Sequence, residues 1–335
     1  EGSSTGKCSA KLETISLKIY SKKYNTEKLE EYINKITQDY IDTIYNKRKN
    51  ELFIYSLLSF KNFRDEGLIP QWDECKFTST RNFNTIFFDK KEELISKIDF
   101  FNNNKEWYEK EGHPYTLGIA LHGPPGTGKT SVIKCIANKL DRHLVVIPLS
   151  KVKTQQQFYQ CFFETGYNHK NAKYNIGFDK KIIVLEDIDC MSDIIMQRKN
   201  TIKELKKKNA TGEDGNVSKN DLLEAITKGM KNDNDYGFLK LPDENSDDLT
   251  LSFLLNIIDG IRETPGRILI ITSNFYNQID TAFKRPGRID ISLEMKNASI
   301  QTIETVVNHY YNKSIDPAIL SKLKDDVISP AKLVN

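Results

Sequence analysis

A glycine-rich loop between two apolar segments constrains the fold of this chain more than any other feature. Within "LHGPPGTGKTSVIKCIANKL", the residues from Gly123 to Thr130 fit the pattern G-x-x-x-x-G-K-[ST]. The apolar run "TLGIALHG" leads into the loop, and apolar residues follow it at helical spacing. Strand, loop, Lys-Thr pair and helix in this order predict a nucleotide-binding phosphate loop.

The residue types in the loop suit phosphate chemistry. Gly126 and Gly128 allow the backbone to turn its N–H groups toward phosphate oxygens, and the N-terminus of the next helix favours the same anions. Lys129 would reach the β- and γ-phosphates, and the Thr130 hydroxyl would bind Mg²⁺. The residues expected to bind the nucleotide are Gly123, Pro124, Pro125, Gly126, Thr127, Gly128, Lys129, Thr130 and Ser131.

From Arg81 onward, strand-like apolar runs alternate with helical stretches. These runs are residues 116–122, 143–148, 181–186, 267–273 and 289–293. The alternation predicts an α/β fold, a parallel sheet flanked by helices on both faces.

The first part of the chain has a different pattern. We expect a flexible leader at 1–10 and a small N-terminal α+β module at 11–80. The module would contain strands at "KLETISLKIY" and "NELFIYSLLSF" and a helix over Asn25–Tyr45. We interpret its aromatic residues as core in preference to a stacking platform for nucleic acid.

Composition excludes several other classes of protein. A net charge of +3 is too small to argue for nucleic acid as a partner. The five cysteines are scattered without C-x-x-C spacing, which favours reduced thiols in an intracellular protein. No apolar run approaches the roughly 20 residues that span a bilayer, so we expect no membrane segment within this chain.

A long polar segment at 196–248 interrupts the α/β pattern. It is rich in Lys, Asp, Asn and Gly and has too few apolar residues to form a core, so we predict a mobile insertion. Its lysine run, Lys206–Lys208, could bind nucleic acid, but a solvated charge run is the favoured interpretation.

Two further strands end in polar residues that suit the same site. "KIIVLEDID" places Glu186, Asp187 and Asp189 at the tip of a buried strand, where α/β ligand sites form. One acid can hold the water shell of Mg²⁺ while the next orients the attacking water. "RILIITSN" ends in Asn274, whose amide can hydrogen-bond that water or the γ-phosphate. The alternative, a surface turn with three acids, fits poorly with four apolar residues leading into it.

A pair of arginines follows in "IDTAFKRPGRID". Arg285 and Arg288 flank a Pro-Gly turn that holds them apart. Such a pair suits the phosphates of a neighbouring subunit, because a guanidinium supplied in trans stabilises charge in phosphoryl transfer. The alternative for Arg288 is a structural salt bridge, for which Asp290 is the nearest candidate in sequence.

With these pieces in order, the chain resembles AAA ATPases. More narrowly, it resembles the mitochondrial inner-membrane AAA chaperone family that translocates the Rieske iron–sulfur protein. The stretches that carry the resemblance are "WYEKEGHPYTLGIALHGPPGTGKTS", "IIVLEDID", "LTLSFLLNIIDGI", "GRILIITSN" and "IDTAFKRPGRID". "ISPAKL" near the end resembles the lid segment of that family.

The resemblance implies a domain arrangement and a cofactor set. It makes 81–295 the large domain of an AAA P-loop NTPase, 296–335 a partial helical lid, and 11–80 a middle-type domain. It implies ATP and Mg²⁺ as cofactors, with Thr130 and Glu186 on the metal. The expected partners are further copies of this chain, in a hexameric or heptameric ring, and a protein cargo.

The resemblance also assigns catalytic roles, residue by residue. These are Gly123–Thr130 as Walker A, Glu186 and Asp187 as Walker B, Asn274 as sensor one, and Arg285 and Arg288 as arginine fingers. The usual AAA acid order, Asp then Glu, is reversed here, as it is in the family that the chain resembles. We favour Asp187 as the general base, while the longer Glu186 stays an alternative.

The resemblance predicts an ATP-driven, ring-forming chaperone or translocase. The segment "PLSKVKTQQQFYQCFFE" lacks the aromatic–apolar–Gly trio of threading machines, which agrees with folded cargo. The alternatives are a nucleic-acid motor or loader, and a nucleotide-gated scaffold with little turnover. We expect a cytoplasmic location for this chain, or the mitochondrial inner membrane if an upstream membrane segment was removed; the chain looks truncated at both ends.

Overall fold

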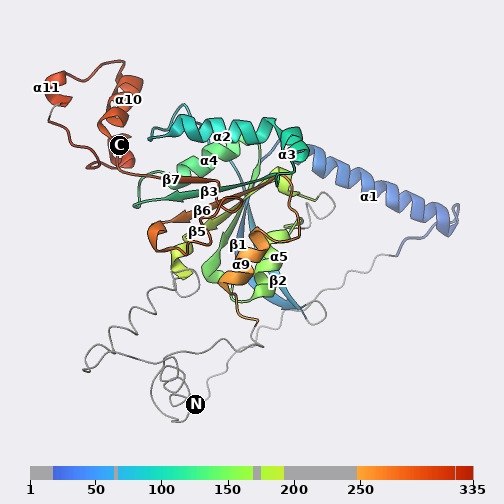
Figure 1. Ribbon diagram of the computed structural model, residues 1–335. Helices are drawn as coiled ribbons and strands as arrows, with labels where there is room; N and C mark the ends of the chain where they lie inside the picture. The colour runs from blue at the N-terminus through green and yellow to red at the C-terminus, as the bar shows by residue number, and fades with distance from the viewer. Residues whose placement is uncertain (1–17, 64–66, 169–174, 192–246, 321, 335) are drawn as a thin grey trace, which may run out of the picture. The chain divides into compact units, whose positions relative to one another are not determined.

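The computed structural model of the chain describes residues 18–63, 67–168, 175–191, 247–320 and 322–334 (Figure 1). The predicted leader, most of the first predicted strand, and nearly all of the predicted insertion at 196–248, Lys206–Lys208 included, lie outside these residues. Contacts divide the chain into two units, Glu1–Asn50 and Glu51–Asn335, which are described separately.

The described part of the first unit is dominated by helix α1 (Thr26–Arg48). The side chain of Asn25 caps it by accepting a hydrogen bond from the backbone N–H of Lys28 at 3.2 Å. Basic residues in the last turn complement the negative end of the helix dipole. The helix predicted over Asn25–Tyr45 is confirmed and continues for one further turn.

The second unit is built on one seven-stranded sheet with the order β2-β1-β4-β5-β6-β3-β7. All neighbouring strands are parallel except β1 and β2, which form an antiparallel pair at one edge. The strands are β1 (Phe53–Phe63), β2 (Gly67–Lys76), β3 (Thr116–His122), β4 (His143–Pro148), β5 (Lys181–Glu186), β6 (Arg267–Ser273) and β7 (Ile291–Glu294). The predicted parallel sheet is confirmed, with β7 beginning two residues later than expected.

The first two strands belong to this sheet, which corrects the predicted boundary after residue 80. Residues 54–56 of β1 pair in parallel with residues 144–146 of β4, and Tyr55 and Leu57 are buried in the shared core. The backbone N–H of Phe53 also donates to Nδ1 of His143 at 3.0 Å. The chain therefore divides after Asn50, since the strands of the expected module pack within the second unit.

Helices cover both faces of the sheet, as predicted (Figure 1). One face packs against α2 (Lys91–Asn103) and α4 (Lys129–Leu140), and the other against α5 (Gln155–Phe163) and α9 (Leu251–Ile258). The short helix α3 (Lys105–Glu111) follows α2. Within the described residues, no helix has the length and apolar character needed to cross a membrane.

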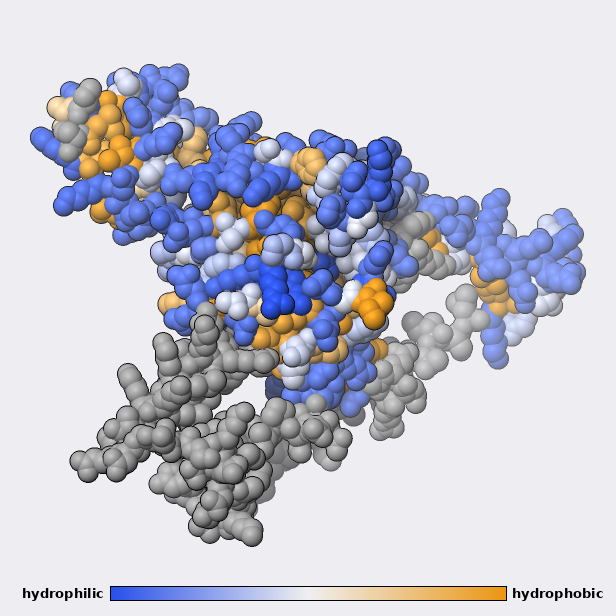
Figure 2. Space-filling model, viewed as in Figure 1, coloured by the Kyte–Doolittle hydropathy of each residue, from blue (hydrophilic) through white to orange (hydrophobic). Residues whose placement is uncertain are grey.

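In the described part of the chain, three helices follow the last strand, in the range expected for a lid. They are α10 (Ile300–Tyr311), α11 (Pro317–Leu320) and α12 (Pro330–Val334). The side chain of Ser299 caps α10 by accepting from the backbone N–H of Thr302 at 3.2 Å. Figure 2 shows hydrophobic residues exposed at these helices as well as over the middle of the second unit, and Ile319 and Val327 are among the exposed ones.

Candidate nucleotide-binding site

The predicted phosphate loop connects the end of β3 to the start of α4. Gly123 has φ of 136°, and a Cβ there would lie 2.1 Å from the carbonyl oxygen of Met295, so the position admits only glycine. Gly128, with φ of 99°, is the N-cap of α4. Residues 123–128 thus cross the carboxyl edge of the parallel sheet, the edge where α/β folds bind ligands.

Lys129 joins the loop to a second strand. Its Nζ donates hydrogen bonds to the carbonyl oxygens of Gly123 at 2.6 Å and Pro124 at 3.0 Å, and to Oδ1 of Asn274 at 3.0 Å. Burial lowers the pKa of the Lys129 ammonium, while the negative charges of Asp187 and Asp189 oppose that shift. The structure therefore brings together a lysine, an amide and two carboxylates from three strand ends.

The acids after β5 lie in an unusual backbone turn. Asp187 has φ of 45°, a left-handed conformation uncommon outside glycine, and its N–H donates to Oγ1 of Thr272 at 2.9 Å. Burial, with the nearby charge of Asp187, raises the pKa of Glu186. Asp187 is exposed, whereas Glu186 is half-buried. The two neighbouring carboxylates thus have different environments.

Asp189 takes part in the site in a way that the sequence did not define. Its Oδ1 accepts a hydrogen bond from the backbone N–H of Asn274 at 3.2 Å. This contact ties the end of β5 to the end of β6, and it fixes the backbone of the residue whose side-chain amide accepts from Lys129. The "LEDID" spacing placed the acid at the strand tip, but only the fold reveals its partner.

The donor set at this edge fits Mg²⁺ bound together with a nucleotide. In the described part of the chain, no group of three His, Cys, Asp or Glu side chains could hold a metal ion by itself. Mg²⁺ in phosphate sites needs only one or two protein oxygens, with phosphates and water completing its shell. The exposed Thr130 at the start of α4 and the carboxylate of Glu186 at the end of β5 offer oxygens of that kind.

The two predicted arginine fingers have different surroundings in the structure. Arg288 pairs through Nε with Oδ2 of Asp259 at 3.2 Å and donates to the carbonyl oxygen of Ala282 at 2.7 Å, leaving 14% of its side chain exposed. Arg285 is exposed. The ion pair considered for Arg288 therefore exists within the chain, but its partner is Asp259 and not Asp290.

Asp290 instead anchors the turn that carries both arginines. Its Oδ1 accepts from the N–H of Gly287 at 2.9 Å, and its Oδ2 accepts from the N–H of Gly118 in β3 at 2.8 Å. A Cβ at Gly118 would lie 1.8 Å from the carbonyl oxygen of Arg288. The arginine turn is thus held against the strand that leads into the phosphate loop.

A cavity of about 210 Å³ opens beside the phosphate loop. Its lining residues come from the loop and α4, from the segment before α2, and from the part of the chain that follows β7. They are Arg81, Thr85, Ile86, Phe87, Phe88, Gly126, Thr127, Gly128, Ser131, Val132, Met295, Val306, Tyr310, Pro330 and Ala331. The aromatic and aliphatic walls suit a nucleotide base. The sequence did not reveal most of this wall, because its residues form no motif and lie in separate segments.

Comparison with known proteins agrees with this geometry. The family described as "ATPase family associated with various cellular activities (AAA)" matches residues 119–235. The chain is 32% identical over 269 residues to "AAA-ATPase At3g28600" of Arabidopsis thaliana, covering 78% of this chain and 48% of the relative. For "AAA-ATPase At5g40000" of the same organism the identity is 30% over 310 residues, covering 90% and 56%.

A third relative carries a cellular location in its name. It is "AAA-ATPase ASD, mitochondrial" of Arabidopsis thaliana, 32% identical over 244 residues, with 72% of this chain and 41% of the relative covered. The chain spans about half the length of these curated relatives.

Proposed function

Because this chain carries an AAA ATPase domain, as the sequence motifs predicted, we propose that it binds ATP with Mg²⁺ across the phosphate loop and hydrolyses it. The observation that carries the proposal is the contact between Nζ of Lys129 and Oδ1 of Asn274 at 3.0 Å. It places the two groups that would face the γ-phosphate at one point on the carboxyl edge of the sheet.

Each residue at this edge has a defined part in the proposed hydrolysis. Lys129 would neutralise the β- and γ-phosphates, and Thr130 and Glu186 would hold Mg²⁺, which would balance the charge of the phosphates. Asp187 accepts the proton of the attacking water, and Asn274 orients that water. The carboxylate of Asp187 is exposed at the tip of β5, whereas Glu186 is half-buried, which supports the role of base for Asp187 over Glu186.

We extend the proposal to a homo-oligomeric ring of six or seven subunits. AAA ATPases generally assemble into rings, and the Asp290 anchor fixes a turn from which Arg285 is exposed. A guanidinium at that position suits the nucleotide of a neighbouring subunit, where it would stabilise the charge of the transition state. Arg288 would join it only if the Asp259 pair opened on assembly.

The proposed activity of the ring is movement or remodelling of a folded protein cargo. The segment between β4 and α5 supports this, because residues 149–154, which form the short turn Leu149–Lys151 and end in the capping residue Thr154, include no aromatic side chain. The name of one relative includes the word mitochondrial, which supports a mitochondrial location as part of this proposal. A nucleotide-gated scaffold is the second candidate, favoured by the engagement of Arg288 within its own chain.

The primary test removes the phosphate-binding cation. We expect Lys129→Ala to abolish ATP binding, measured by calorimetric titration with Mg²⁺ present, and with it phosphate release. The matched control is Lys139→Ala, which removes a lysine from the other end of the same helix, where Nζ pairs with Asp99 at 2.7 Å. Binding of ATP by Lys129→Ala with wild-type affinity would contradict the proposed site, and binding without turnover by wild type would favour the scaffold.

A further inference from the structure

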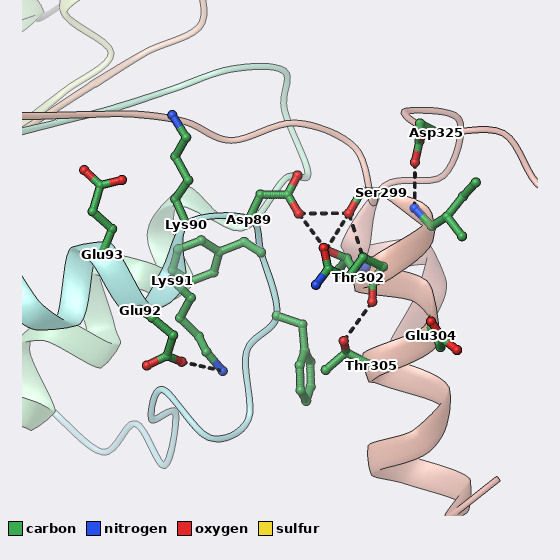
Figure 3. Close-up of a pocket in the computed structure, with 14 residues that line it drawn as sticks. Asp89, Lys90, Lys91, Glu92, Glu93, Ser299, Thr302, Glu304, Thr305 and Asp325 are labelled. Carbon is green, nitrogen blue, oxygen red and sulfur yellow. Dashed lines mark hydrogen bonds and ion pairs between the residues drawn. The ribbon is translucent and has the colours of Figure 1, made fainter. Parts of the chain in front are cut away.

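The start of the lid helix α10 is hydrogen-bonded to a carboxylate from a distant part of the chain (Figure 3). Oδ1 of Asp89 accepts from the hydroxyl of Ser299 at 2.8 Å and from the hydroxyl of Thr302 at 3.0 Å. Ser299 Oγ also accepts from the backbone N–H of Thr302 at 3.2 Å. Asp89 thus fixes the capping residue of α10 and adds negative charge at the positive end of the helix dipole.

A second carboxylate at this helix end comes from the lid itself. Oδ1 of Asp325 accepts from the backbone N–H of Ile300 at 2.7 Å. Asp325 therefore stabilises the lid internally, whereas Asp89 joins the lid to the segment that precedes α2. At the start of α10, Asp325 thus accepts from a backbone N–H, and Asp89 accepts from two side-chain hydroxyls.

The segment that ends in Asp89 also forms a wall of the 210 Å³ cavity beside the phosphate loop, called here the nucleotide cavity. Residues 85–88 line one side of that cavity, and Val306 and Tyr310 of α10 line another. The Phe87 ring lies 5.1 Å from the His309 ring and 6.4 Å from the Tyr310 ring, between centroids. Asp89 and Phe87 therefore dock the same helix at two points, one near its start and one near its end.

Lys91 holds the Phe87 side of this contact in place. Its Nζ donates to the carbonyl oxygen of Phe83 at 3.2 Å and lies 5.4 Å from the centre of the Phe87 ring. The cavity wall and the lid contact therefore share one short, internally braced segment. A shift of α10 along this segment would change the width of the nucleotide cavity.

The remaining space between α10 and the start of α2 is not packed. A wide cavity of about 870 Å³ lies there, lined by charged and polar side chains such as Lys90, Glu92 and Glu304 (Figure 3). Since side chains do not fill this space, the docking of α10 depends strongly on the hydrogen bonds of Asp89 and the rings around Phe87.

We propose that Asp89 is a positioning residue for nucleotide binding, one that sets the lid helix against the wall of the nucleotide cavity. The proposal rests on the proposed function, since it takes the cavity to be the nucleotide site. The hydrogen bonds of Asp89 go to α10, so its loss leaves the phosphate-binding residues in place. Asp89 therefore acts on affinity through the fraction of molecules with the lid correctly docked.

The test separates affinity from turnover in the full chain. We expect Asp89→Ala to raise the Kd for ADP, measured by calorimetric titration, by about five-fold or more, because charged hydrogen bonds of this kind are among the stronger ones. Turnover at saturating ATP should stay within about two-fold of wild type, since ligand in excess restores the docked lid. Asp89→Asn keeps an acceptor oxygen and should recover most of the affinity.

The matched control removes an acid from the neighbouring turn without touching the lid. Glu93 pairs with Lys97 within α2 at 2.9 Å, so Glu93→Ala should bind ADP with the wild-type Kd. Partial misfolding of a variant would lower the number of binding sites while leaving Kd unchanged, so it cannot mimic the expected result. If Asp89→Ala does not fold, Ser299→Ala combined with Thr302→Val removes both donors and is judged by the same Kd.

The outcomes distinguish the two proposals. An unchanged Kd for Asp89→Ala, with wild type binding ADP normally, would overturn the positioning role and leave the proposed function intact. Failure of wild type to bind either ADP or ATP would overturn the proposed function, and the positioning role with it. A raised Kd accompanied by an equal loss of saturated turnover would also overturn the positioning role, because it would place Asp89 in the chemistry.

Discussion

At the scale of single residues, the two acids after β5 pose the sharpest question, namely which of them is the base. We expect Asp187→Asn to lower turnover by about 100-fold or more, as loss of a general base does, while ATP binding persists. Asparagine tolerates the left-handed backbone at this position better than most residues, so the turn at φ of 45° should survive. Glu186→Gln should instead raise the Mg²⁺ concentration needed for half-maximal turnover.

The measurement is steady-state phosphate release across a Mg²⁺ titration, for both variants and wild type. Loss of turnover in Glu186→Gln with an unchanged Mg²⁺ requirement would make Glu186 the base and contradict the assignment to Asp187. The raised pKa of Glu186 makes this reversal chemically reasonable, since a carboxylate that holds its proton more tightly is also a better proton acceptor.

Some of these residues could be predicted from sequence and others could not. Lys129 and Asn274 meet because each follows a parallel strand, and the carboxyl ends of such strands share one edge. No sequence motif indicates the hydrogen-bond partners that Asp89 and Asp290 have in the structure. Their hydrogen bonds reach residues 210 and 172 positions away in sequence, and only the packed fold brings those partners together.

At the scale of elements, the turn before β7 tests whether Arg288 is a finger or a structural cation. We expect Arg288→Ala to retain ATP binding but lose turnover by about 1,000-fold, the usual cost of an arginine finger. Asp259→Ala, which removes the partner of Arg288 within the chain, should cost far less turnover. The measurement is phosphate release by both single variants and the double variant, with thermal unfolding recorded alongside.

Equal losses in the two single variants, with no added loss in the double variant, would contradict the finger. That result would mean that Arg288 and Asp259 affect turnover only through the ion pair that they form with each other. Arg285→Ala serves as the comparison within the same turn, because Arg285 is exposed and its removal leaves the Asp259 contact intact. Turnover that survives both arginine variants would contradict the trans fingers and count against the ATP-driven ring.

The elements also show where sequence patterns stop being sufficient. The strands from β3 to β6 were predictable because each is a continuous apolar run, typical of strands buried on both faces. β2 was not, since it contains Pro70 and several polar residues. It lies at the edge of the sheet, where a missing N–H is tolerated. The sequence does not indicate that β1 pairs with β4. The sequence pattern alone therefore groups β1 and β2 in a separate module.

At the scale of the whole molecule, the proposed finger requires a second copy of the chain. We expect ATP with Mg²⁺ to promote a closed ring, because a finger can contact a nucleotide only when its neighbour is in place. The measurement is mass photometry of wild type and Asp187→Asn, with and without ATP. The variant should hold the ring longer, since it binds ATP without consuming it. Particles of six or seven chains that increase with ATP would support the ring. A single-chain mass under every condition, together with intact ATP binding, would contradict assembly of this chain by itself and make the nucleotide-gated scaffold the better account.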